Sequence, residues 1–191
     1  MRLFTAIEIE PALARALGEV SAELRRRVES RAPRARLTWV PVERLHLTVR
    51  FIGEVDAEQA AAIGRALAPE LPVEPFDLTL REIGTFPPRA APRVIWVGVG
   101  GGAEPMGAIE REVTRRLASC GIQPEQRGYN PHLTLARVRD AGGLRQSDVV
   151  DPGPAPVFGA TRVGAITLFE SRLSQKGPAY IPLQQTGLGR T

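Results

Sequence analysis

Two short stretches, His46-Leu47-Thr48-Val49 and His132-Leu133-Thr134-Leu135, share one pattern and hold the only two histidines of this 191-residue chain. Each lies in a run of residues that predicts a β-strand. Because side chains alternate between the two faces of a strand, each histidine shares a face with the threonine two places later. The apolar residues point the other way and can anchor the strand to a core. Two such strands facing each other would line a cleft with two imidazoles and two hydroxyls.

The segments around these motifs predict an α+β protein. Apolar residues at three-to-four spacing indicate helices over 11–30, 57–68 and 105–121. Alternating or apolar runs indicate strands over 2–9, 44–52, 76–83, 93–99, 132–138, 163–173 and 179–183. The run Asp-Pro-Gly-Pro-Ala-Pro at 151–156 predicts a linker or surface loop, and we expect the tail from Gly187 to fray. Strands outnumber helices and many connections are short, which favours mainly antiparallel sheets.

Composition excludes the disordered and fibrous classes, because 43% of the residues are hydrophobic, 24% are charged and the net charge is +4. One cysteine cannot form an internal disulfide, which fits a reducing compartment. Glu8 and Glu10 interrupt the first apolar run before a secretory signal develops, and no stretch is long enough to span a membrane. We therefore expect a cytoplasmic protein that does not bind a membrane.

All but one of the 25 positively charged residues are arginine, the exception being Lys176. Arginine recognises phosphate with two parallel hydrogen bonds, so a cluster of arginines can follow a nucleic-acid backbone. The chain has such a cluster at Arg25, Arg26, Arg27, Arg31, Arg34 and Arg36. A solvated helix face has the same composition, and both interpretations stay open.

Two histidines without a nucleophilic serine or cysteine favour acid–base catalysis across a central atom. Near neutral pH one imidazole can take a proton while the other gives one. Cleavage of a phosphodiester needs such a pair, since the entering oxygen loses a proton and the leaving oxygen gains one. Thr48 and Thr134 are placed to hold the non-bridging phosphate oxygens together with nearby arginines.

Three other interpretations compete with catalysis by paired histidines. The run Gly98-Val99-Gly100-Gly101-Gly102-Ala103 matches the fingerprint of a dinucleotide-binding turn, but the strands around it look antiparallel and a flexible glycine turn explains it better. A metal site is disfavoured because neither histidine has a matched carboxylate or thiolate nearby in sequence. A non-catalytic RNA-binding module would use Trp39, Phe86 and Trp96 for stacking and would tolerate substitution of both histidines.

The paired motifs occur with further segments in a recognisable order, namely Trp39-Val40-Pro41, residues 92–96 (Pro-Arg-Val-Ile-Trp), Pro131 and residues 168–173 (Leu-Phe-Glu-Ser-Arg-Leu). This set, which spans Phe4 to Tyr180, resembles the two-histidine phosphoesterase superfamily. Within it, the chain is most similar to the RNA 2′,3′-cyclic phosphodiesterase family, also called the 2′-5′ RNA ligase family. The resemblance implies a bilobal α+β fold in which two mainly antiparallel sheets with flanking helices form a central cleft. Each lobe would carry one motif, and residues 1–191 would form a single two-lobed domain.

The resemblance also implies a reaction. His46 would be the proton donor and His132 the acceptor that activates water against a 2′,3′-cyclic phosphate, leaving a 2′-phosphate, with no metal and no cofactor. The substrates would be RNA ends with a cyclic phosphate or small cyclic nucleotides, and ligation to 2′-5′ linkages is a second activity of such enzymes. We expect a monomer.

The same family places an arginine five residues after the second histidine, where this chain has Arg137. Strict strand alternation would turn Arg137 away from the cleft, so a phosphate contact there requires a bulge or a twist. Two weaker candidates for substrate contacts are Phe86, for stacking on a base, and Arg93, for a phosphate. One departure is Tyr129-Asn130 before Pro131, where relatives carry an aromatic residue or a histidine directly before the proline, which puts the ribose and base contacts in doubt.

Overall fold

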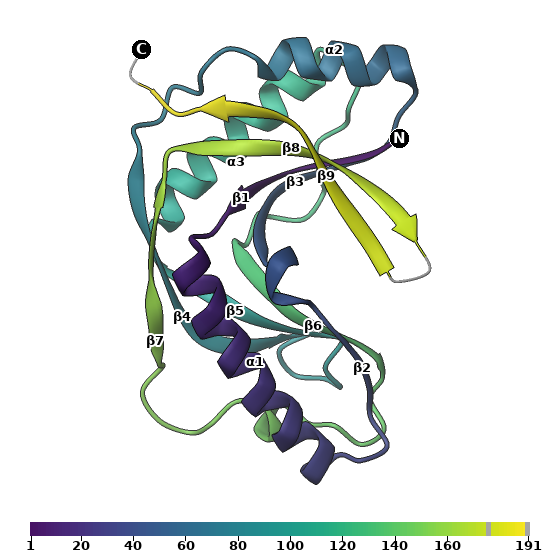
Figure 1. The fold of residues 1–191 in the computed structure, drawn as a ribbon, viewed down its shortest axis with the longest axis vertical. Coiled ribbons are helices and arrows are strands. Elements are labelled where there is room, and N and C mark those ends of the chain that lie inside the picture. Colours follow the sequence, from purple (N-terminus) through teal and green to yellow (C-terminus); the bar gives the residue numbers. More distant parts are fainter. Residues whose placement is uncertain (175–176, 190–191) are drawn as a thin grey trace.

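A computed structural model describes residues 1–174 and 177–189 of the chain (Figure 1). The elements follow one another as β1 (Arg2–Glu8), α1 (Pro11–Arg31), β2 (Arg36–Trp39), η1 (Val42–Arg44), β3 (His46–Glu54), α2 (Ala57–Leu67), β4 (Phe76–Phe86), β5 (Val94–Gly101), α3 (Ala103–Ala118), β6 (His132–Asp140), η2 (Gln146–Asp148), β7 (Val157–Val163), β8 (Ala165–Ser174) and β9 (Gly177–Gly187). The prediction of an α+β protein with antiparallel strand pairing is confirmed.

The strands form one continuous, strongly curled sheet in the order β7-β4-β5-β6-β3-β1-β8-β9, and β2 pairs with the outer part of β6 (Figure 1). Two sheets were expected, and they occur as two halves of this one sheet. The halves meet where β3 and β6 lie antiparallel, and a single residue pair, Leu47 with Leu133, joins them. These two leucines are the central apolar residues of the two histidine motifs, so the motifs themselves form the seam of the molecule.

The helices begin and end where local chemistry predicts. Asp56 caps α2, since its carboxylate accepts a hydrogen bond from the Gln59 backbone N–H at 2.8 Å. Pro11 opens α1, which ends one residue beyond the prediction. α3 begins at Ala103, two residues earlier than expected, because Gly102 adopts a left-handed conformation (φ 87°) and turns the chain directly from β5 into the helix. β5 has only antiparallel neighbours, β4 and β6, so this glycine run is not part of a βαβ dinucleotide-binding unit.

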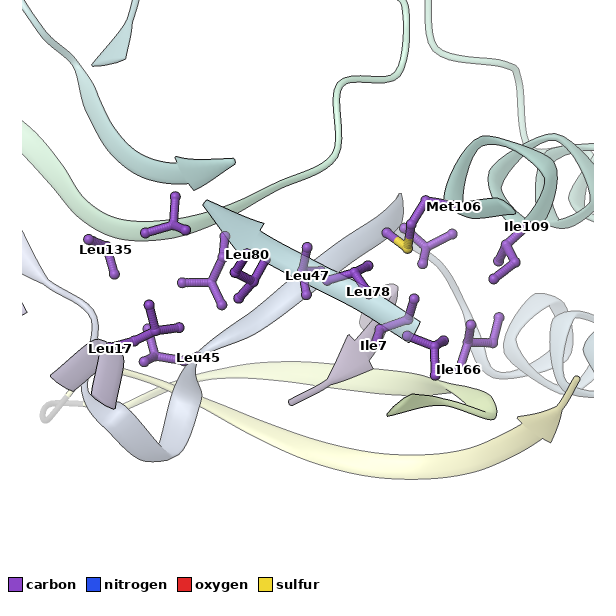
Figure 2. Close-up of a cluster of buried hydrophobic side chains, with 14 of the residues drawn as sticks. Ile7, Leu17, Leu45, Leu47, Leu78, Leu80, Met106, Ile109, Leu135 and Ile166 are labelled. Carbon is purple, nitrogen blue, oxygen red and sulfur yellow. The ribbon is translucent and has the colours of Figure 1, made fainter. Parts of the chain in front are cut away.

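The helices pack on different parts of the molecule. α1 contacts β7, whereas α2 contacts α3, and α3 contacts β3 (Figure 1). Leu17 of α1, Ile109 of α3 and the strand residues Leu47 and Leu135 belong to one cluster of buried side chains that continues through both halves (Figure 2). Each such leucine stabilises the fold by about 1.5–3 kcal/mol through removal of apolar surface from water. The apolar residues of both motifs thus fix the strands from below.

Three segments differ from the predictions. A single strand was expected over 163–173, but Gly164 separates β7 from β8. β7 pairs with β4 in one half of the sheet, whereas β8 pairs with β1 in the other half. β2 lies in a stretch for which no strand was predicted. The tail was expected to fray, yet Leu188 is 7% exposed and its N–H donates to the Gly164 carbonyl, so the chain is held as far as Gly189, while residues 190–191 lie outside the described residues.

Candidate active site

The two motifs lie side by side with the same exposure pattern. His46, Thr48, His132 and Thr134 are half-buried, whereas Leu47 and Leu133 are fully buried. In an antiparallel ladder with Leu47 opposite Leu133, His46 lies next to Thr134, and Thr48 lies next to His132. The four polar side chains therefore occupy the corners of a quadrilateral. The histidines stand at one pair of opposite corners and the threonines at the other pair.

Each imidazole is fixed by the same local contact. Nδ1 of His46 lies 2.8 Å from the Arg44 carbonyl, and Nδ1 of His132 lies 2.8 Å from the Asn130 carbonyl. A carbonyl oxygen only accepts, so Nδ1 carries the proton and donates it in both rings. Nε2 is then the atom of each ring that can take up or release a proton.

Aromatic rings surround each imidazole on its own side of the seam. Phe4 and Tyr180 have ring centroids 5.2 Å from that of His46, and the Tyr180 ring is edge-on. Phe86 lies 5.1 Å from His132, also edge-on, and Trp96 lies 6.4 Å from it. Phe86, which the sequence offered for stacking on a base, thus packs against one of the two histidines.

The position of the Trp96 ring depends on two glycines, one on β4 opposite it and one two residues further along β5. Gly84 stands opposite Trp96 in the β4–β5 ladder, and a Cβ atom there would overlap the indole ring, while a Cβ at Gly98 would come within 3.0 Å of it. The indole therefore lies flat against the sheet and supports Phe86, whose centroid is 5.1 Å away. This packing fixes the wall behind His132.

Burial lowers the pKa of both imidazoles from its ordinary value near 6.5, because removal from water penalises the charged ring. The hydrogen bond from each ring to its carbonyl opposes this effect. The positive charge of Arg137 lowers the pKa of both rings further. Both histidines are consequently neutral at pH 7 in the unliganded protein.

Arg137 lies on the sheet face that carries the four motif side chains, called the cleft face below, because β6 contains a bulge. In the β5–β6 ladder Ile95 pairs with Ala136 and Trp96 with Thr134, so Leu135 is the extra residue. Ala136 is buried as a result, and Arg137 returns to the exposed face that carries Thr134. The bulge that a phosphate contact by Arg137 would require is therefore present in β6.

β3 contains the same irregularity, and it exposes a residue that the sequence analysis missed. Thr5 pairs with Arg50 and Ala6 with Thr48, which leaves Val49 extra and returns Phe51 to the cleft face. Phe51 is 51% exposed and its ring centroid lies 6.2 Å from that of Phe4. Phe51 follows His46 by the same five residues that separate Arg137 from His132, and this spacing was the signal that could have revealed it.

Arg93 lies just before β5, where its carbonyl accepts a hydrogen bond from the Val138 N–H and its side chain is exposed. Val94 pairs with Arg137 on the cleft face, so alternation turns Arg93 to the other face. Among the contacts of the described residues, none joins Arg93 to either histidine. The structure therefore does not bring Arg93 to the quadrilateral.

A polar cluster around one buried arginine lies beneath the site and was also missed. Arg50 is 3% exposed, forms an ion pair with Glu125 at 2.8 Å and donates to the Gln123 carbonyl. The hydroxyl of Tyr129 donates to the Thr48 carbonyl at 3.1 Å, and burial raises the pKa of this phenol. Both residues tie the segment that leads into His132 to the strand that carries His46 and Thr48. The sequence gives no sign that the arginine at position 50 is buried, since the bulge decides its direction.

A pocket of about 770 Å³ opens beside His46 between α1, η1 and the β8–β9 hairpin. Its wall is mainly apolar, with Phe4, Phe169 and Tyr180, and Arg15 and Arg44 lie at its edge. Its lining includes His46 and none of the other three motif side chains. Apolar and aromatic surface next to a polar quadrilateral suits a ligand with a flat ring and a charged group.

The described residues contain no group of three or more histidine, cysteine or acidic side chains arranged to hold a metal ion. Trp39, one of the aromatic residues considered for RNA stacking, packs against the main core. None of the helices in the described part of the chain has the length and apolar character needed to cross a membrane.

Comparison with known proteins adds independent information. The family model described as LigT like Phosphoesterase matches twice, over residues 11–96 and 97–180. A protein of Aeropyrum pernix named RNA 2′,3′-cyclic phosphodiesterase is 43% identical over 145 residues, which cover 75% of this chain and 81% of that protein. A protein of the same name from Methanocaldococcus jannaschii is 32% identical over 181 residues, 94% of this chain and 96% of the relative. The crystal structure of Escherichia coli LigT complexed with 3′-AMP matches with a TM-score of 0.67 and 26% identity, covering 99% of this chain and 98% of that one.

Proposed function

The chain belongs to the LigT-like phosphoesterase family, and from this we propose that it is an RNA 2′,3′-cyclic phosphodiesterase that opens cyclic ends to 2′-phosphomonoesters. The names of its relatives support the activity. The diagonal arrangement of the two histidines, with both Nδ1 atoms held by carbonyls, is the observation that carries the mechanism.

Hydrolysis of a cyclic phosphate requires in-line displacement at phosphorus. A phosphorus atom above the middle of the quadrilateral has one imidazole on each side along one diagonal, so water can enter from one end while O3′ leaves at the other. The two threonine hydroxyls lie along the other diagonal, where the non-bridging oxygens point. These hydroxyls donate to the oxygens, and the Arg137 guanidinium stabilises the charge that builds up on them.

We assign the two proton transfers by analogy with the family. Nε2 of His132 takes a proton from water, the water oxygen bonds to phosphorus, the P–O3′ bond breaks, and His46 gives its Nε2 proton to O3′. The product keeps phosphate on O2′, and the imidazoles have exchanged protonation states. Solvent then restores them, so the cycle needs no other acid or base.

His46 must be protonated for this reaction, although burial and Arg137 keep its pKa low in the unliganded protein. The anionic phosphate supplies the missing charge, since a negative group close to an imidazole favours its protonated form. The ribose lies on the His46 side because O3′ is the leaving atom. The pocket beside His46 and the exposed ring of Phe51 offer it apolar neighbours.

The test is hydrolysis of a short RNA ending in a 2′,3′-cyclic phosphate, with EDTA present, by the wild type, His46→Ala and His132→Ala. We expect a 2′-phosphate product from the wild type and a fall in rate of roughly 10² to 10⁴ in each variant. A 3′-phosphate product, or wild-type rates in both variants, would overturn the mechanism. Equal binding of the RNA by all three proteins with no turnover by any of them would identify an RNA-binding module instead.

A further inference from the structure

Three arginines continue from the candidate active site along the outer part of β6 and onto β2. Arg137 and Arg139 are both exposed, and Arg139 is the extra residue of a second bulge in β6, because Leu37 pairs with Val138 and Arg36 with Asp140. Thr38 of β2 pairs with Arg137 and therefore lies on the same face, as does Arg36 two residues earlier. Nε of Arg139 donates to the Thr38 hydroxyl at 3.4 Å, which draws the two strands' polar side chains together. We call Arg36, Arg137 and Arg139 the arginine row.

The members of the arginine row are not held in ion pairs with other described residues. None of the ion pairs among the described residues includes any of its three members. Asp140, which stands opposite Arg36, uses a carboxylate oxygen to accept from the Gly142 N–H at 3.0 Å. Guanidinium groups without an ion pair can bind phosphate at little cost, because the one contact among the described residues that a phosphate would replace is the 3.4 Å hydrogen bond from Arg139 to the Thr38 hydroxyl.

Two of the α1 arginines that the sequence singled out are held in ion pairs. Arg25 pairs with Glu29 at 3.1 Å, and Arg27 pairs with both Glu23 and Asp151. These residues stabilise the helix and fasten it to the segment after η2. Of the six arginines in that sequence cluster, Arg36 is the one that lies in a strand on the cleft face.

The arginine row starts on the correct side of the reacting phosphate. His46 lies next to Thr134 in the ladder, and β6 continues from Thr134 past the bulge to Arg137 and Arg139. In the proposed mechanism the ribose is on the His46 side, so the RNA chain that precedes the cyclic end leaves the site in this direction. Residues two apart on one strand face are about 6.6 Å apart, a step suited to successive phosphates of an extended single strand.

We infer that the arginine row binds the backbone phosphates upstream of the cyclic end, so that the preferred substrate is an RNA oligomer and not a cyclic mononucleotide. This inference rests on the proposed function. Arg137 contacts the reacting phosphate, whereas Arg139 and Arg36 contact phosphates that only an oligomer has. The contacts are electrostatic and independent of sequence, since no base-reading group is involved.

The experiment compares two substrates, 2′,3′-cyclic AMP and a hexameric RNA with a 2′,3′-cyclic end, in the wild type and in the double variant Arg36→Gln, Arg139→Gln. We expect kcat/KM for the hexamer to fall about tenfold or more, and kcat/KM for cyclic AMP to stay within about twofold. The slope of log(kcat/KM) for the hexamer against log[salt] should become shallower by about 0.7 for each phosphate that the variant no longer neutralises. The matched control is the double variant Arg25→Gln, Arg26→Gln on α1. It removes the same charge and should leave kcat/KM unchanged for both substrates.

Equal losses of kcat/KM for both substrates, no loss for the hexamer, or the same loss in the α1 control would each overturn the inference. The proposed function is tested separately, because it predicts that the wild type opens the cyclic end of the hexamer to a 2′-phosphate, whatever the effect of the arginine variants. Fluorescence anisotropy with the labelled hexamer measures RNA binding directly, so it tests the role of the arginine row even without turnover. Weaker binding in the Arg36, Arg139 variant alone would support it, and equal binding by all three proteins would overturn it.

Discussion

Phe51 and Arg137 occupy the same position in the two copies of the histidine motif. Each follows its histidine by five residues, each comes after a bulge, and each is exposed on the cleft face. The four motif residues are related by near symmetry, with the same carbonyl contact at both imidazoles. The difference between the two sides of the site therefore resides in this outer pair, an apolar ring at one end and a positive charge at the other.

Burial of the two imidazoles and, to a smaller extent, the charge of Arg137 should set the pH of maximal activity. Burial and Arg137 both lower the pKa of both imidazoles, so the state with one neutral and one protonated ring is most populated below pH 6.5. We expect a bell-shaped profile of kcat/KM with its maximum below that pH, because His46 loses its proton as the pH rises. Arg137→Gln removes a positive charge, raises both pKa values and should move the maximum to higher pH, while Arg137→Lys should leave it in place. A maximum that is unchanged or lower in Arg137→Gln would contradict this account.

The threonine hydroxyls should act in the transition state more than in binding. Thr48→Val and Thr134→Val keep the side-chain shape and remove one donor each, so kcat should fall by roughly tenfold to a thousandfold with little change in KM. Steady-state kinetics on the cyclic-ended RNA gives both values. Unchanged kcat in both variants would remove the hydroxyls from the site.

The polar cluster beneath the site should contribute both stability and position. Arg50→Met removes the buried guanidinium that pairs with Glu125 and donates to the Gln123 carbonyl. Because Glu125 is 49% exposed and returns to water, we expect a loss of about 1.5–3 kcal/mol, the contribution of a charge-assisted hydrogen bond. The exposed pair between Arg162 and Asp77 is the matched control, and Arg162→Met should cost under about 1 kcal/mol. Denaturant unfolding measures both values. Equal losses of stability in the two variants would show that burial of Arg50 is not what matters.

The variant Tyr129→Phe distinguishes a role in positioning His132 from a role in the stability of the fold. It removes only the hydrogen bond to the Thr48 carbonyl, which is worth about 1 kcal/mol. We expect kcat to fall severalfold at a temperature where the variant is fully folded, because the segment leading into His132 is less firmly held. A fall in thermal stability with unchanged kcat and an unchanged pH profile would assign Tyr129 a purely structural role.

Gly84 should be intolerant of any side chain. A methyl group at Gly84 meets the indole of Trp96, so Gly84→Ala should destabilise the protein by about 1–3 kcal/mol. Activity should fall as well, since Trp96 supports Phe86, and Phe86 contacts His132. Gly164→Ala, where a Cβ meets nothing within 4 Å, is the control. Calorimetry gives the stability of both variants, and turnover gives their activity. Equal losses of stability in both variants would exclude the clash with Trp96 as the cause.

Local chemistry made much of the site predictable. The alternation of His46, Leu47 and Thr48 decides which side chains reach the cleft, and a capping aspartate or an opening proline decides where a helix begins. The direction of Arg137 and the burial of Arg50 were not predictable in this way. Both depend on bulges at Leu135 and Val49, which arise from how long strands fit their neighbours and leave no mark in the residue pattern.

The pairing of strands that are distant in sequence also could not be predicted. One continuous sheet, in place of two, depends on the pairing of Leu47 with Leu133, residues that are distant in sequence. β7 was missed because a segment with Gly159 and Ala160 in its middle lacks the bulky residues that signal a strand. Its pairing with β4 supplies what its own sequence does not.

The exchange of helices between the two halves of the sheet has a consequence for the whole chain. α1 comes from the first family match and packs on β7 from the second, while α3 comes from the second and packs on β3 from the first. The boundary between the matches, after Trp96, falls inside β5. The molecule is thus the single-chain equivalent of a domain-swapped dimer, in which each repeat lends its helix to the other. Each repeat carries one of the two histidines and a helix that packs on a strand of the other repeat, so we expect that neither repeat folds or hydrolyses a cyclic phosphate alone.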